Sequence, residues 1–476
     1  MVGVAGRSKG CKTCRRRKKG CDFGQPICEN CKRTNNSCEY DRQQVFINVT
    51  APTSSKGSSA KSSLPSTDIV LPQTLARSAY EDKYLSIFWD IWFPCGPTSA
   101  DCSSKYPISS WTTSARDLYR HDAALRRTLL AMCLSTLGRK ENRPSLMADG
   151  FQTYVKALRE VNVSLRNPKR WSSDAVVVAS RGLGLFELLY GVQDESQVEG
   201  SQAKSWHGHN VGELALIQQR GPEAYTDGDA HWLFAEGRMH LAIAGCMSRK
   251  RCFLSDLRWK TIPWSKIPKT PKDVMLDILT DVPALLQDLD LLQQAMTSNM
   301  SRRFLRTYRR LDKEIVWWLE NLSPPQKTLD ALHERHYENP TADELAVAHV
   351  MTYFWTACIF VYSSLHTTLL APLEILGADA VELSERTDPR RYCMKIADTV
   401  EVFFQPEAGT FGMHAAPFPI GIAMKYLMLT EGYTEDFMRF LEYFSRQSDG
   451  EAMGRFLVNS LPEWMTKDES IPQIPS

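Results

Sequence analysis

Hydrophobic residues recur at intervals of three or four positions over most of the chain, which is the pattern of amphipathic helices. One stripe comprises Phe151, Tyr154, Val155, Leu158, Val161 and Leu165, and a second comprises Phe304, Tyr308, Leu311, Ile315 and Trp318. Segments near residues 78–92, 116–137, 229–246, 273–296 and 411–430 follow the same spacing. Alternating, strand-like runs are scarce, and no solenoid-type repeat is visible. We therefore predict a mostly α protein with one large all-α domain over residues 76–470.

The helical pattern is absent from the first 75 residues, which divide into two parts. Over residues 50–67, seven positions are serine and three are threonine, and Leu64 is the only large apolar residue. Such a segment cannot bury enough apolar surface to offset the entropy of ordering it. It also has no heptad run, so no coiled coil is predicted there. We predict a small cysteine-rich domain over residues 1–47 and a flexible Ser/Thr-rich linker over residues 48–75.

One apolar stretch of the helical domain is long enough to cross a bilayer. Residues 345–373 contain no Lys, Arg, Asp or Glu, and about 20 apolar residues suffice for a span. The stretch nevertheless holds two histidines and several threonines and serines, with Pro372 near its end. True spans are more uniformly apolar. We therefore favour a buried core helix and no membrane partner, with a membrane-tethered protein as the alternative.

The charge of the chain is unevenly distributed. The whole chain has 57 Lys and Arg against 55 Asp and Glu, a net of +2. Residues 1–40 contain ten Lys and Arg against three Asp and Glu, whereas the remaining residues contain 47 against 52. A basic head is therefore attached to a mildly acidic body, and the near-neutral total does not exclude a nucleic-acid partner for the head.

Six of the 13 cysteines lie in the basic head. They are Cys11, Cys14, Cys21, Cys28, Cys31 and Cys38, and they form two copies of the spacing C-x2-C-x6-C. Because no signal-peptide pattern precedes them, clustered cysteines indicate metal ligands rather than disulfides. Thiolate-rich closed sites suit zinc. Two tetrahedral ions need eight ligand positions, which six thiolates fill if two of them bridge both metals, and the spacing alone does not say which two.

The head also lacks the apolar residues for a core of its own. Its larger apolar side chains are Val2, Val4, Phe23, Ile27 and Tyr40. Segments this short rarely fold without metal or disulfides, and structural zinc supplies about 10–16 kcal/mol of apparent binding energy in small zinc peptides. We therefore predict two zinc ions per chain as the cofactor that folds the head.

Five consecutive cations, Arg15, Arg16, Arg17, Lys18 and Lys19, lie between the second and third cysteines. The charges of these side chains repel one another unless an anion lies opposite them. DNA is such an anion, with about one negative charge per 1.7 Å of helix axis. A short helix carrying these residues could enter the major groove, where one or two side chains reach guanine acceptors and the others hold phosphates. We predict contact with double-stranded DNA, and the same residues can serve as a nuclear-import signal.

The head closely resembles the fungal binuclear zinc-cluster transcription factors. The resemblance rests on the run from Gly10 to Asp22 and on the run from Gln25 to Arg33. It implies that Cys11 and Cys28 bridge the metals and that Lys18 reads a CGG-type triplet. It further implies that Arg15, Arg17 and their neighbours hold phosphates and that Pro26 shapes the loop between the two halves. This sequence departs from the family at Gly20, where the family usually has a basic residue, and Lys19 is the candidate substitute.

The helical body resembles, more weakly, the regulatory region of filamentous-fungal members of that family. The matching residues are Trp206, His209-Asn210-Val211-Gly212, Arg220-Gly221-Pro222, Leu233-Phe234, Arg238, Trp259-Lys260 and Pro263-Trp264. This weaker resemblance implies the all-α fold class and a regulatory role, and it implies no ligand. The resemblance to the family as a whole implies a nuclear regulator of RNA polymerase II genes that acts with the transcription machinery and regulates a biosynthetic, secondary-metabolite gene cluster. It leaves a homodimer open.

No catalytic motif is recognisable in the body, and we predict no enzyme and no catalytic residues. The pairs His207/His209 and His333/His336 and the glycines Gly182 and Gly184 are weak metal or nucleotide signals, and we interpret them as structural. The seven cysteines outside the head are predicted to be buried apolar residues. A helical ligand receptor or enzyme with an accessory zinc module remains the alternative function.

One further pattern in the body is a row of arginines on a helix face opposite Phe304, Tyr308 and Leu311. These are Arg302, Arg303, Arg306, Arg309 and Arg310. The preferred interpretation is a solvated face or one paired with acidic neighbours, and the alternative is a second contact with a protein or nucleic acid.

Overall fold

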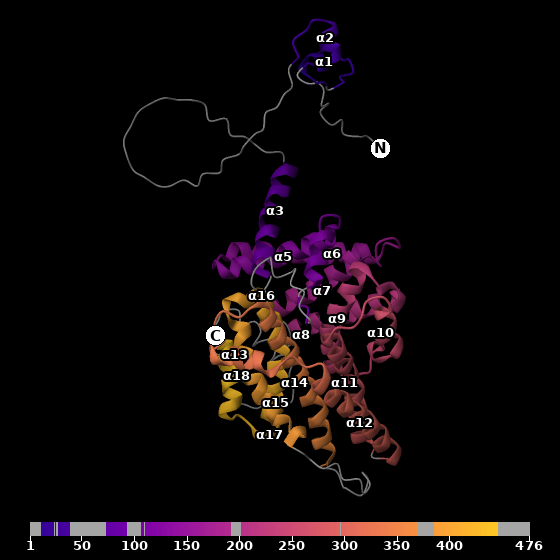
Figure 1. The fold of residues 1–476 in the computed structure, drawn as a ribbon, viewed down its shortest axis with the longest axis vertical. Coiled ribbons are helices and arrows are strands. Elements are labelled where there is room, and N and C mark those ends of the chain that lie inside the picture. The colour runs from indigo at the N-terminus through magenta and orange to yellow at the C-terminus, as the bar shows by residue number, and fades with distance from the viewer. Residues whose placement is uncertain are drawn as a thin grey trace, which may run out of the picture. The chain divides into compact units, whose positions relative to one another are not determined.

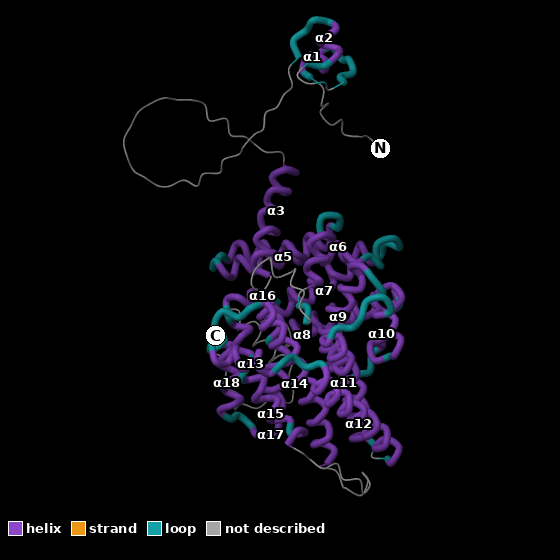
Figure 2. The backbone as a smooth tube through the Cα atoms, viewed as in Figure 1, coloured by secondary structure: helices purple, strands orange, loops and turns teal. Residues whose placement is uncertain are grey.

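The structure is a computed structural model that describes residues 11–22, 24, 27–38, 73–92, 106–108, 110–191, 201–295, 297–369 and 385–445. The chain divides into two compact units, Met1–Val70 and Leu71–Ser476, which are described separately. Within the described residues every regular element is a helix (Figure 2), so the mostly α prediction is confirmed. The predicted linker between residues 48 and 72, the stretch 446–470 of the predicted helical domain, and Cys95 and Cys102 lie outside the described residues, and the predicted domain limits stay predictions.

The first unit contains two short helices, α1 (Lys12–Arg16) and α2 (Glu29–Arg33). The second unit (Figure 1) contains α3 (Gln73–Trp92), α4 (Ser110–Leu118), α5 (Ala123–Lys140), α6 (Pro144–Leu165), α7 (Asp174–Tyr190), α8 (Ser201–Arg220), α9 (Gly228–Ser248), α10 (Leu257–Thr261), α11 (Pro271–Gln294), α12 (Ser298–Asn321), α13 (Gln326–Glu334), α14 (Ala342–Leu369), α15 (Pro389–Ala397), α16 (Gly409–Ala415), α17 (Pro417–Glu431) and α18 (Glu435–Ser445). Short 3-10 turns join them at η2 (Pro222–Tyr225), η3 (Phe253–Ser255), η4 (Ile262–Trp264), η6 (Glu385–Thr387), η7 (Val400–Phe404) and η8 (Pro406–Ala408).

Helix α14 lies at the centre of the helical unit. It packs against α11, α12, α13, α15 and α17, and it coincides with most of the uncharged stretch. One described segment, Ala342–His366, is long and apolar enough to cross a membrane, and 94 % of its most apolar window is buried inside the unit. That burial is what the core-helix interpretation requires, because a core helix is covered by protein on every side.

The two predicted apolar stripes have different outcomes. All five residues of the α12 stripe are buried. On α6, Tyr154 and Val161 are buried, but Phe151 is 43 % exposed and Leu165 is 42 % exposed. Here α5 and α6 approach so closely that a Cβ built on Gly150 would lie 2.3 Å from the Ser135 hydroxyl. The predicted helix is present as α6, but its close contact with α5 covers only part of the stripe.

Two predicted helical segments are interrupted. Within residues 116–137, α4 ends at Leu118 and Asp122 then caps α5, because its Oδ1 accepts the N–H groups of Ala124 at 2.8 Å and Leu125 at 3.0 Å. Within residues 411–430, α16 ends at Ala415 and α17 begins at Pro417, since proline favours the first position of a helix.

Some of the body residues that carry the weaker resemblance form a small core beside Arg238. Trp259 and Trp264 belong to an apolar cluster with Phe234 and Tyr225. The Arg238 guanidinium lies 4.0 Å from the centre of the Trp264 ring and forms ion pairs with Asp273 at 2.8 Å and with Asp277 at 2.6 Å. Because a buried arginine requires such partners, these residues are accounted for by structure alone.

The cysteines, histidines and glycines singled out in the body have the following surroundings. Of the predicted buried cysteines, Cys133, Cys246, Cys358 and Cys393 are buried and Cys252 is half-buried. His209 lies 3.3 Å from the Tyr154 hydroxyl, and His333 lies 2.9 Å from the Tyr337 hydroxyl. Gly182 and Gly184 lie inside α7, and in the described part of the chain no strand precedes them. These contacts agree with the structural interpretation of each signal.

Two buried histidines bear on the stability of the body. His349 is enclosed by Tyr353, Phe403 and Phe411, and neither of its ring nitrogens has a partner among the described residues. Burial lowers the pKa of His349 well below 6.5 and lowers the pKa of His414 to about 3. Both side chains therefore stay neutral in the folded unit, whereas in the unfolded chain they bind protons below about pH 6.5.

We expect the free energy of unfolding to fall as the pH drops below about 6.5, because the unfolded chain then binds more protons than the folded chain. Replacing His349 with Phe removes the titrating ring from a pocket that is already aromatic. Between about pH 7 and about pH 5, the variant should lose about 2 kcal/mol less stability than the wild type in denaturant titrations. The matched variant His121→Gln, at an exposed position, should follow the wild type. Equal pH dependence of His349→Phe and the wild type would contradict this account.

Candidate metal centre and nucleic-acid interface

The two halves of the cysteine-rich unit have the same backbone design. Helix α1 begins directly after Cys11 and helix α2 directly after Cys28. The Cys11 Sγ accepts the N–H of Cys14 at 3.3 Å, and the Cys28 Sγ accepts the N–H of Cys31 at 3.4 Å. Each cap residue also donates its own N–H to the third cysteine of its half, at 3.5 Å to Cys21 and 3.3 Å to Cys38. A sulfur at the start of each helix thus replaces the usual oxygen cap and points inward.

The six cysteines form two overlapping groups of four. One group is Cys11, Cys14, Cys21 and Cys28, and the other is Cys11, Cys28, Cys31 and Cys38. In each group all four sulfurs lie within 4.8 Å of one another. Cys11 and Cys28 belong to both groups, and they are the two residues to which the resemblance gives the bridging role. Because two sulfurs are shared, the six sulfurs supply eight ligand positions, which is the number that two tetrahedral ions need.

The sulfur spacing fits zinc. A tetrahedral ion with Zn–S bonds of about 2.3 Å places its sulfurs about 3.8 Å apart. The Sγ atoms of Cys11 and Cys28 are 3.8 Å apart, those of Cys14 and Cys28 are 3.7 Å apart, and those of Cys11 and Cys31 are 3.6 Å apart. Burial raises the pKa of the Cys14 thiol to about 12 and also raises the pKa of Cys31. A divalent ion supplies the positive charge that such buried thiolates need.

Polar side chains around the cysteines fix the loops of the unit. The Asn30 side chain donates to the Gly20 carbonyl at 2.6 Å, and the Thr13 hydroxyl donates to the Ser37 carbonyl at 2.6 Å. The Asp22 carboxylate accepts the N–H of Glu29 at 3.1 Å, and this bond lowers the pKa of Asp22. These positioning residues are not among those predicted from the sequence. The available signal was that polar residues able to bond to backbone flank the cysteines.

The basic run is only partly helical, which corrects the expectation of one helix carrying all five cations. Helix α1 ends at Arg16, and Lys18 has a φ of 52° in the left-handed region. The N–H of Lys19 then bonds to the Cys14 carbonyl at 3.1 Å, which closes the helix end in a Schellman-type turn. The second half repeats the device, with Asn35 at a φ of 48° and the N–H of Asn36 bonded to the Cys31 carbonyl at 3.0 Å.

The contrast between Lys18 and Asn35 singles out Lys18. Asparagine adopts the left-handed region readily, whereas lysine does so at a cost of about 1–2 kcal/mol. A strained residue that the fold retains is a candidate for function. Lys18 is exposed at the end of α1, beside the buried cysteines, so its ammonium is free to contact a partner.

The other predicted DNA-binding residues differ in their surroundings. Arg16 and Lys19 are exposed. The Arg17 guanidinium donates to the Thr34 hydroxyl at 3.0 Å and so reaches across to the end of α2. The side chain of Arg15, and Pro26 with its predicted role in the loop, lie outside the described residues.

Comparison with known proteins identifies the cysteine-rich unit. Residues 9–45 match the family model of the fungal Zn(2)-Cys(6) binuclear cluster domain. This domain binds two zinc ions through its six cysteines, so zinc is the cofactor of the unit, and it supports a DNA-binding transcription factor. No curated protein and no solved structure matched the chain.

The shared sulfurs yield a test of the metal centre. We expect Cys28→Ser to lower the zinc content from two ions per chain to less than one, because Cys28 belongs to both groups of four. Zinc would be measured on the purified full chain by atomic emission. The control Cys133→Ser, at a buried cysteine of the helical body, should retain two ions. A Cys28→Ser chain that keeps two ions would show that Cys28 is not shared.

Proposed function

We propose that the protein is a sequence-specific transcription factor that reads a CGG-type triplet in double-stranded DNA through Lys18. The observation that carries the proposal is an exposed lysine held in the left-handed region at the end of α1, beside the buried metal centre. The metal cluster and the turn closed by the Lys19 N–H fix the backbone of Lys18, and so the point from which its side chain extends. Preorganisation of that kind lowers the entropic cost of a base contact.

The neighbouring cations supply affinity rather than sequence preference. Arg16 and Lys19 flank Lys18 on the exposed surface and are suited to hold phosphates, as Arg15 and Arg17 are by their position in the run. Two zinc ions and six thiolates together carry a charge of −2, so residues 1–40 keep a net charge of about +5 when loaded with metal. Phosphate contacts of this kind set register and salt dependence, and base contacts select the sequence.

The helical body is the proposed regulatory part of a nuclear protein acting on RNA polymerase II genes. Several of its buried charged groups are paired in structural networks, such as Arg181 with Glu213 at 2.7 Å and Lys272 with Glu236 at 2.9 Å. This use of charge favours a scaffold over an enzyme. Regulation of a biosynthetic, secondary-metabolite gene cluster and the formation of a homodimer belong to the same proposal.

Replacing Lys18 with Asn tests the proposed reading of bases. Asn occupies the equivalent left-handed position of the second half, at Asn35, so the variant should keep both the turn and the zinc. We expect discrimination between CGG and mutated triplets to fall by about 1–3 kcal/mol in competition binding assays with the full chain. The control Lys32→Ala, which removes an equivalent exposed charge from α2, should keep the preference. Unchanged discrimination in Lys18→Asn would refute the assignment.

Gly20 allows a gain-of-affinity test. A Cβ built on Gly20 meets nothing within 4 Å, so a side chain fits there, and the bond from Asn30 to the Gly20 carbonyl does not involve the side chain. We expect Gly20→Lys to add one phosphate contact and to steepen the plot of log affinity against log salt by about 0.9. Gly20→Ser is the neutral control. If the slope of Gly20→Lys matches that of Gly20→Ser, this loop does not lie near the DNA backbone.

A further inference from the structure

The arginines of helix α12 differ in whether they form ion pairs with acidic residues. Arg303 forms an ion pair with Asp288 at 2.7 Å, and Arg310 contacts Asp281 at 2.5 Å and Glu314 at 3.0 Å. Asp281 and Asp288 are buried residues of α11, so these two arginines help to hold α12 against α11. The expectation of pairing with acidic neighbours is therefore met by Arg303 and Arg310.

Three other cations of α12 have no such partner among the described residues. Arg302, Arg306 and Lys313 are exposed, and across the described ranges no ion pair or hydrogen bond joins their side chains to another residue. Solvated cations placed one turn apart repel one another, which is a cost that an anionic partner would relieve. They therefore form a surface suited to binding.

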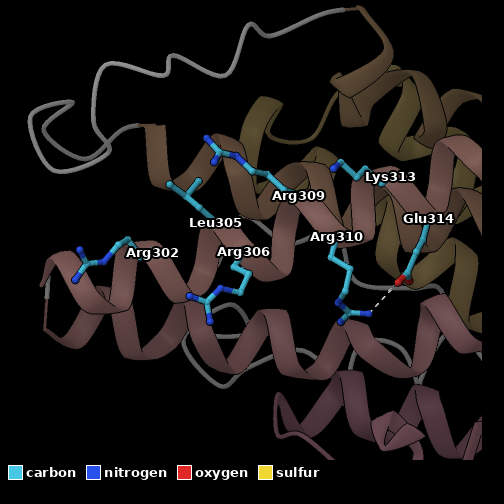
Figure 3. Close-up of a pocket in the computed structure, with 7 residues that line it drawn as sticks. All are labelled: Arg302, Leu305, Arg306, Arg309, Arg310, Lys313 and Glu314. Atoms are coloured by element: carbon cyan, nitrogen blue, oxygen red, sulfur yellow. Dashed lines mark hydrogen bonds and ion pairs between the residues drawn. The ribbon is translucent and has the colours of Figure 1, made fainter.

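These cations line an open groove of about 590 Å³. Figure 3 shows Arg302 and Arg306 on one side and Arg309 and Lys313 on the other, with Leu305 between them. The groove's one carboxylate among the described residues, Glu314, is bonded to Arg310 at 3.0 Å and so neutralises part of that charge. The groove thus places the exposed cations Arg302, Arg306 and Lys313 beside the apolar side chain of Leu305, and an occupant must match both features.

We propose that this groove binds an acidic peptide segment of a partner protein, with an apolar side chain of the peptide against Leu305. Guanidinium groups pair with carboxylates through two parallel hydrogen bonds. Successive turns of a helix are 5.4 Å apart, and alternate residues of an extended peptide are about 6.6 Å apart. Carboxylates at every second position of the peptide can therefore meet cations on successive turns of α12.

The lining of the groove favours a peptide over DNA. Leu305 lies among the cations, and an apolar side chain of a peptide can pack against it, whereas the phosphate backbone of a duplex offers no apolar partner.

The experiment uses the full chain without DNA and a fluorescein-labelled peptide in which Asp alternates with Ser and a Leu lies at the centre. The control peptide has Asn in place of every Asp. In fluorescence anisotropy the Asp peptide should bind at least about tenfold more tightly than the Asn peptide, because charge-assisted hydrogen bonds are the stronger kind. The double variant Arg302→Glu/Arg306→Glu should weaken binding of the Asp peptide by about tenfold or more.

The matched control is Lys156→Glu/Arg159→Glu, which reverses two exposed cations on α6 and should change affinity by no more than about twofold. The proposal is overturned if the wild type does not prefer the Asp peptide or if both double variants lose affinity equally. It is also overturned if a duplex without CGG displaces the peptide and the α12 variant lowers the salt dependence of DNA binding. Since the peptide assay contains no DNA, its failure leaves the proposed reading of CGG untouched.

Discussion

The cysteine-rich unit depends on the sharing of sulfur between two metal positions. Cys11 and Cys28 belong to both groups of four, and each also begins a helix by capping it. Metal binding and helix formation therefore use the same atoms. A unit with so few apolar residues has no other core, so the binding energy of zinc is its folding energy. The placement of Lys18 at the end of α1 follows from that core.

The helical body is stabilised in a different way, by an uncharged central helix and by buried ion pairs between the helices around it. Helix α14 is covered on all sides, whereas Arg238 bonds to Asp273 and Asp277 between α9 and α11. Breaking one partner of such a pair leaves an uncompensated buried charge. These networks account for the body's buried charges structurally, whereas the exposed cations Arg302, Arg306 and Lys313 of α12 take no part in them.

The features that could be predicted from the sequence are those set by local spacing. The cysteine repeat predicted zinc, and the apolar spacing of α12 predicted its buried face, because both depend on neighbours along the chain. The left-handed turn at Lys18 depends on a helix end closed by the Cys14 carbonyl, which the run of five cations does not reveal. Likewise, the sequence does not reveal which arginines of α12 are paired. Arg303 differs from Arg306 only because Asp288 of α11 lies within ion-pair distance of it. The same holds for the α6 stripe. The position of α5 decides which residues of α6 are buried, and the spacing of apolar residues does not reveal that position.

The central claim is that two zinc ions build the surface that reads DNA. The most direct measurement starts from the metal-free full chain and follows the anisotropy of a labelled CGG duplex as zinc is added. The account predicts no specific binding without zinc, and binding that saturates at two equivalents per chain, as the two groups of four require. Specific binding by the metal-free chain, or saturation at a single equivalent, would contradict it.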